Sequence, residues 1–137
     1  MAGFITAILI NGLSRYYQLS GDERLPDAID RAVTFLDNDT WREEWRDWRY
    51  TSCPATKATH QPGVVMMAHV NGARMGNARH ARILSIAWEA KFAHLRQAPP
   101  SGPGQGKAYT AQMYGCAETA LPGRSTGIGR GGLGSSR

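Results

Sequence analysis

The protein has 137 residues, of which 42% are hydrophobic and 20% are charged, as is typical of one globular domain rather than of a disordered or fibrous chain. Its net charge of +5 is unevenly divided, because residues 98–137 contribute +3 and residues 1–97 only +2. No apolar run reaches the roughly 18 residues that a membrane-spanning helix requires. The basic residues gather neither on one expected face nor along one helix, which argues against a nucleic-acid-binding protein.

The N-terminal residues lack the basic start and the small-residue cleavage pattern of a secretory signal peptide. Read as a complete chain, the sequence therefore predicts a soluble, cytoplasmic protein. Two cysteines do not make a disulfide scaffold, so we expect Cys53 and Cys116 to be free thiols.

Residues 4–19 are expected to form the first helix, because their apolar side chains recur at helical spacing. They form one stripe that contains Phe4, Ile5, Ile8, Leu9, Gly12, Leu13 and Tyr16. Gly21 is predicted to end this helix in a left-handed conformation, and Asp22 to cap a second helix. The apolar positions of that second helix are Ile29, Ala32, Val33 and Leu36. A short turn between two apolar-striped helices predicts a helical hairpin.

The next segment carries Trp41, Trp45 and Trp48 at i, i+4 and i+7, a spacing that predicts one side of a helix. From Tyr50 to Pro62 the sequence is typical of a loop. Residues 63–75 and about 78–95 then predict a second helical hairpin, displaced from the first by 55 residues. Repeated hairpins at a fixed period indicate a stacked-repeat architecture.

The helical pattern stops after residue 97. Residues 98–137 hold 10 of the 16 glycines and 4 of the 7 prolines, and they have too little apolar surface to offset the entropy of ordering. The sequence thus predicts an all-α fold in which two antiparallel helical hairpins, residues 1–97, precede a disordered Gly-rich tail, residues 98–137.

Two segments of the first hairpin, LSRYYQLSGDER at 13–24 and AIDRAVTFL at 28–36, resemble the hairpin consensus of (α/α) toroid proteins. The linking segment WRYTSCP at 48–54 is also similar to one found between toroid hairpins. This superfamily includes six-hairpin glycosidases and heparinase-like and alginate-lyase-like polysaccharide lyases. The resemblance covers about residues 4–95, and two hairpins stand where a closed toroid has roughly six. It therefore implies a partial toroid, a fragment of a carbohydrate-active lyase or glycosidase that is inactive alone.

The resemblance also implies where an oligosaccharide would bind. Aromatic rings pack on the C–H faces of sugars and arginine pairs with uronate carboxylates, so Trp45, Trp48 and Arg49 are the candidate substrate contacts. Tyr50 is the candidate catalytic base, as tyrosine is in several toroid lyases, provided that a nearby cation favours its ionised form. The structural alternatives are core packing for the tryptophans and a loop anchor for Tyr50.

The other motifs predict neither a metal nor a cofactor. The histidines lack the spacing of paired metal ligands, and His69 and His80 are expected to be partly exposed helix residues. The glycines at 127–132 lack the flanking strand and helix of a phosphate-binding loop. The alternative to a carbohydrate-active fragment is a non-enzymatic helical interaction module, which binds a protein partner or forms a homo-oligomer through an exposed hairpin face.

Overall fold

A computed structural model describes residues 3–51 and 62–97 of the chain. The described residues form, in order, α1 (Gly3–Ser20), α2 (Leu25–Thr40), β1 (Trp41–Arg42), β2 (Asp47–Trp48), α3 (Pro62–Arg74) and α4 (Ala78–Gln97). The expected all-α class is confirmed, with one small antiparallel sheet added. The predicted tail at 98–137, Cys53 and Cys116 lie outside the described residues. None of the described helices is both long and apolar enough to cross a membrane.

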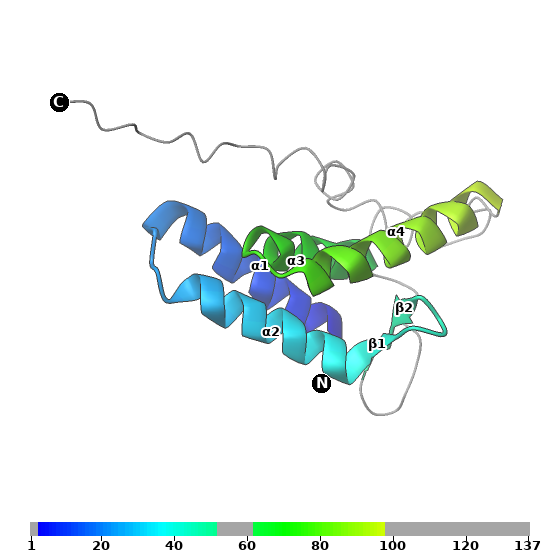
Figure 1. Cartoon of the computed structure of the whole chain (residues 1–137), viewed down its shortest axis with the longest axis horizontal. Coiled ribbons are helices and arrows are strands. Elements are labelled where there is room, and N and C mark those ends of the chain that lie inside the picture. The colour runs from blue at the N-terminus through cyan, green and yellow to red at the C-terminus, as the bar shows by residue number, and fades with distance from the viewer. Residues whose placement is uncertain (1–2, 52–61, 98–137) are drawn as a thin grey trace.

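The four helices form two antiparallel hairpins, α1 with α2 and α3 with α4, and the hairpins pack together through α1 and α3 (Figure 1). Both hairpins turn in the same way. Gly21 and Gly76 have φ values of +66° and +101°, in the region that glycine adopts without steric cost. The backbone N–H two residues after Asp22 donates to its carboxylate at 3.0 Å, and the N–H two residues after Asn77 donates to its side-chain oxygen at 3.0 Å. The turns therefore repeat at the expected offset of 55 residues.

The tryptophan-rich segment is a β-hairpin, so the predicted helix at this place is wrong. β1 and β2 pair in antiparallel register with Trp41 opposite Trp48, and residues 43–46 make the turn. Arg46 closes this turn with a φ of +50°. The helical spacing was misleading because a seven-residue interval also brings two side chains opposite each other across a tight hairpin. The two indole rings meet with their centroids 5.0 Å apart.

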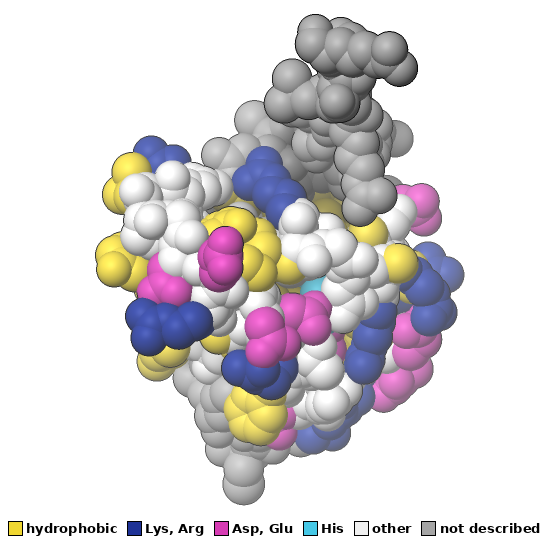
Figure 2. Space-filling model, turned by 60° about the vertical axis from the view of Figure 1, so that its left-hand side comes forward, with side chains coloured by type: hydrophobic (Ala, Val, Ile, Leu, Met, Phe, Trp, Pro, Cys, Tyr) yellow, Lys and Arg dark blue, Asp and Glu magenta, His cyan; other side chains and the backbone are white. Residues whose placement is uncertain are grey.

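The core lies between the two hairpins and is made of apolar side chains from all four helices and from the β-hairpin. Its fully buried members include Ile10, Ile29, Val33, Leu36, Trp48, Val65, Met66, Leu84 and Ala87. On the surface, basic and acidic side chains are interspersed over the face that Figure 2 presents, with hydrophobic side chains exposed among them.

Helix α1 buries a different face from the one that its apolar stripe suggests. The residues that it buries are the small Gly3, Ala7 and Ser14, together with Ile10. Most of the expected stripe is exposed, since Leu9 retains 62% of its accessible surface. Both faces of α1 are rich in apolar residues, so periodicity could not identify the buried face. Small side chains allow closer approach, and a Cβ on Gly3 would lie 3.3 Å from the carbonyl oxygen of Arg49.

Candidate functional site

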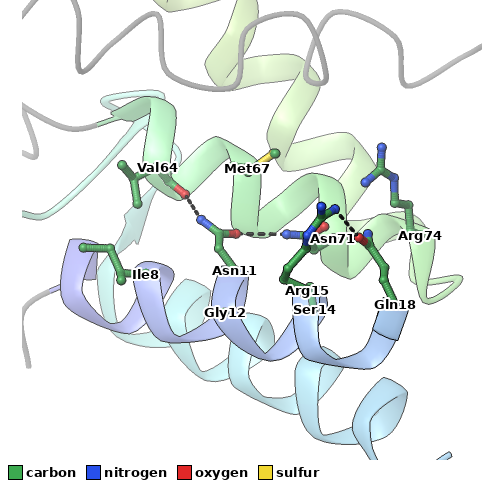
Figure 3. A pocket seen from close by; sticks show the side chains of 10 residues that line it. All are labelled: Ile8, Asn11, Gly12, Ser14, Arg15, Gln18, Val64, Met67, Asn71 and Arg74. Carbon is green, nitrogen blue, oxygen red and sulfur yellow. Dashed lines mark hydrogen bonds between the residues drawn. The ribbon is translucent and has the colours of Figure 1, made fainter. Parts of the chain in front are cut away.

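A groove of about 610 Å³ lies between α1 and α3, the helices that join the two hairpins (Figure 3). It is lined by Ile8, Asn11, Gly12, Ser14, Arg15, Gln18, Val64, Met67, Asn71 and Arg74. Asn11 crosses between the two walls, because its Nδ2 donates to the carbonyl oxygen of Val64 at 3.1 Å. Its Oδ1 accepts a hydrogen bond from Nδ2 of Asn71 at 2.9 Å. These bonds fix the spacing of α1 and α3, so the walls of the groove are preformed.

The groove is cationic. Its lining contains the guanidinium groups of Arg15 and Arg74 and no carboxylate. Neither α1 nor α3 contains a single aspartate or glutamate, whereas α2 has four aspartates. The lining thus combines two positive charges, several amides and an aliphatic patch. Such a surface can bind an anion that also carries apolar atoms. The sequence analysis did not identify these residues as a site. The available signal was the lack of aspartate and glutamate in residues 3–20 and 62–74, which is visible in the sequence.

A second polar cluster is buried in the core and centres on Asp37 of α2. Its Oδ1 lies 2.6 Å from Nε2 of His69 and 3.4 Å from Nε1 of Trp48, and its Oδ2 lies 3.2 Å from Nδ1 of His80. The side chains of Asp37, His69 and His80 have no exposed surface. The cluster therefore connects α2 with β2, α3 and α4 in a place that a substrate does not reach.

Every ring nitrogen of the two histidines faces a hydrogen-bond acceptor. Nδ1 of His69 lies 2.7 Å from the carbonyl oxygen of Val65, and Nε2 of His80 lies 3.0 Å from Oδ1 of Asp30. Because carbonyl and carboxylate oxygens accept, full satisfaction requires each ring to donate from both nitrogens. The expectation that these histidines are partly exposed is wrong.

The electrostatics of Asp37 follow from these neighbours. Burial alone would raise its pKa, because a charge is poorly solvated in the core. The charge and hydrogen bond of His69, followed by those of His80, outweigh burial and hold the pKa well below the usual aspartate range. Asp37 is therefore an ionised carboxylate in a satisfied network, which stabilises the junction of the two hairpins.

The residues that the sequence suggested as substrate contacts differ in their exposure. Trp48 is fully buried between Trp41 and His69, with ring centroids 5.0 and 4.8 Å away, so neither face of its ring is free for a sugar. Core packing, the structural alternative, accounts for it. Trp45 and Arg49 are partly exposed.

Tyr50 occupies an anchoring position. Its ring stacks on Phe4 with a centroid distance of 5.3 Å, and its carbonyl oxygen accepts a hydrogen bond from the N–H of Gly3 at 3.1 Å. These contacts attach the start of α1 to the segment that follows the β-hairpin. Tyr50 retains 37% of its accessible surface. The role of its hydroxyl as a catalytic base stays a prediction.

The described residues contain no group of three or more His, Cys, Asp or Glu side chains placed to hold a metal ion. Comparison with family models, with curated protein sequences and with solved structures finds no match to this chain.

Proposed function

We propose that this protein is a non-enzymatic helical-hairpin module that docks onto a partner through the outer face of α1. The observation that supports this proposal is an exposed apolar stripe, called here the outer stripe. Its members follow each other at intervals of four, three, four and three residues: Ile5, Leu9, Gly12, Tyr16 and Leu19. The four large side chains among them are 56–79% exposed.

A helix that is apolar on both faces is normally buried on both. One face of α1 packs against the core of the protein, and the other face is exposed to solvent. In the described part of the chain, only Phe35 and Tyr50 are exposed large hydrophobic residues outside α1. The four-three spacing is that of a coiled-coil seam, in which apolar side chains of one helix pack into spaces on another helix. A helical partner is therefore the occupant that this stripe fits.

A second copy of the chain is the partner that we propose. When two α1 helices cross antiparallel, Ile5 of each can face Tyr16 of the other, and Leu9 can face Gly12. A large residue then stands opposite a small one at the centre, and the same patch serves both subunits, as a two-fold interface requires. α1 carries only one charged residue, Arg15, so little charge must be desolvated.

Sedimentation of the full chain over a range of concentrations tests this proposal. The wild type should form a dimer as concentration rises, and Leu9→Glu should remain monomeric, because it places a charge in the centre of the seam. Phe35→Glu is the matched control, since Phe35 is 59% exposed but lies on α2. It should dimerise like the wild type. A wild type that stays monomeric at high concentration, or a dimer that persists in Leu9→Glu with unchanged helicity, would contradict the proposal.

A second candidate is that the two hairpins belong to a larger carbohydrate-active (α/α) toroid. The repetition of both turns at an offset of 55 residues supports it, since toroids stack similar hairpins. A neighbouring hairpin would then cover the outer stripe. This candidate predicts a change in tryptophan fluorescence with uronate or neutral oligosaccharides, and its loss in Trp45→Ala. The absence of any response to these sugars would reject it.

A further inference from the structure

We propose that the groove between α1 and α3 binds a small aliphatic carboxylate. Its charged end would lie at Arg15 and Arg74, and its chain would pack against Ile8, Val64 and Met67. This site goes beyond the docking function proposed above, because the groove shares only Gly12 with the outer stripe.

The cationic end of the groove lacks acidic partners. Nη1 of Arg15 donates to Oε1 of the neutral Gln18 at 3.0 Å. In the described part of the chain, neither Arg15 nor Arg74 has a carboxylate oxygen within 4 Å. Other cations of the fold do pair with acids there, namely Arg24, Arg31, Arg82 and Lys91. Because guanidinium groups bind carboxylates through two parallel hydrogen bonds, the unpaired arginines suit an anionic head group.

The apolar end of the groove determines the rest of the ligand. In Figure 3, Ile8 and Val64 lie at one end of the groove, and Arg15, Gln18 and Arg74 lie towards the other. The lining contains no aromatic ring, so it has no surface on which a sugar or a nucleobase would stack. A volume of about 610 Å³ falls within the range of small-molecule sites. An aliphatic chain with a terminal carboxylate matches both ends.

Calorimetric titration of the full chain with decanoate tests this site, at a protein concentration where sedimentation gives a single species. We expect a dissociation constant of roughly 0.1–1 mM, from the usual affinity per ligand atom. Decanol lacks the charge and acetate lacks the chain, so each should bind at least tenfold more weakly. Arg15→Gln and Arg74→Gln should each weaken decanoate binding by about tenfold, because each removes a charged contact. Arg31→Gln, an exposed arginine on α2, should leave binding unchanged.

Several results would overturn the proposal. Equal binding of decanol and decanoate would show that the arginines do not recognise the head group. Full affinity in the double variant of Arg15 and Arg74 would show the same. Tighter binding of a uronate oligosaccharide than of decanoate would assign the groove to sugars. An absence of decanoate binding at 10 mM, roughly ten times the weakest expected constant, would also reject the site. None of these results bears on the dimer, which Leu9→Glu tests separately.

Discussion

The carboxylate of Asp37 is the place where one substitution tests the buried network most directly. It has no exposed surface and lies 2.6 Å from His69, 3.2 Å from His80 and 3.4 Å from Trp48. Asp37→Ala would leave three buried donors without their acceptor. Removing one partner of a buried ion pair costs about 3–5 kcal/mol in the free energy of unfolding. Because domains of this size are stable by only about 5–15 kcal/mol, Asp37→Ala should come close to unfolding the protein.

Asp37→Asn separates the charge of the side chain from its shape. The amide keeps one acceptor oxygen, so we expect a smaller loss of about 1–3 kcal/mol. Urea unfolding measures both variants, with circular dichroism reporting on the helices and fluorescence on the four tryptophans, of which Trp48 lies with its ring 4.8 Å from that of His69. A loss of less than about 1 kcal/mol in Asp37→Ala, the net value of an ordinary hydrogen bond, would show that the buried network does not stabilise the fold. A larger loss of stability in Asp37→Asn than in Asp37→Ala would show the same.

The difference in stability between the wild type and Asp37→Asn should depend on pH with a definite sign. Burial raises the pKa of Asp37, but the charges and hydrogen bonds of His69 and His80 lower it further than burial raises it. A carboxyl whose pKa is lower in the folded state stabilises the fold above its unfolded pKa of about 3.9. That contribution is lost as the pH falls through the folded pKa. The stability difference between wild type and Asp37→Asn should therefore be greatest near neutral pH and shrink below about pH 4.

Three further substitutions test local packing and charge. Gly72→Ala should destabilise the fold by about 1–3 kcal/mol in thermal unfolding, because the added Cβ would lie 2.7 Å from Cδ2 of His80. This clash outweighs the higher helix propensity of alanine, which favours the helix by about 1 kcal/mol. Gly12→Ala, whose Cβ meets nothing within 4 Å, should instead raise the stability of the monomer by up to about 1 kcal/mol; the opposite order would contradict the packing around His80. The carboxyl of Asp22 should titrate by NMR with a pKa of about 2, because the side chain and backbone N–H of Arg24 bond its ionised form. In Arg24→Gln this pKa should rise towards the ordinary aspartate value, and an unchanged midpoint would show that the bond to the Arg24 side chain is absent in solution.

The hairpins and their turns could be predicted from the sequence, because local chemistry determines them. Gly21 ends α1 at a positive φ, and Asp22 accepts a hydrogen bond from the backbone N–H of Arg24 within the turn, although Arg24 rather than the predicted Asp22 occupies the N-cap position of α2. Gly76 and Asn77 repeat both features. Each of these interactions involves residues a few positions apart, so the residue types carry enough information.

The buried face of α1, the β-hairpin and the histidine network could not be predicted, because each depends on partners far away in the chain. Asp37 is 32 residues from His69 and 43 from His80. Their spacing therefore contains no signal of a shared cluster. For Trp41 and Trp48 the interval of seven residues fits a helix and a tight hairpin equally well. Of the candidate site, only the cationic character of the groove is visible in the sequence, as two helical segments that contain no acidic residue.

The buried network and the groove lie at the same junction of the two hairpins but are held by different side chains. Asp37 holds α2 against α3 and α4, and Asn11 holds α1 against α3. Asn11→Ala should therefore loosen the walls of the groove while leaving the network intact. We expect it to weaken decanoate binding several-fold and to reduce stability by about 1 kcal/mol, the net value of a typical hydrogen bond. Leu9→Glu should instead abolish the dimer and leave the affinity for decanoate unchanged. If Leu9→Glu also abolished decanoate binding, the groove would be complete only in the dimer, and the two proposed surfaces would be parts of one site.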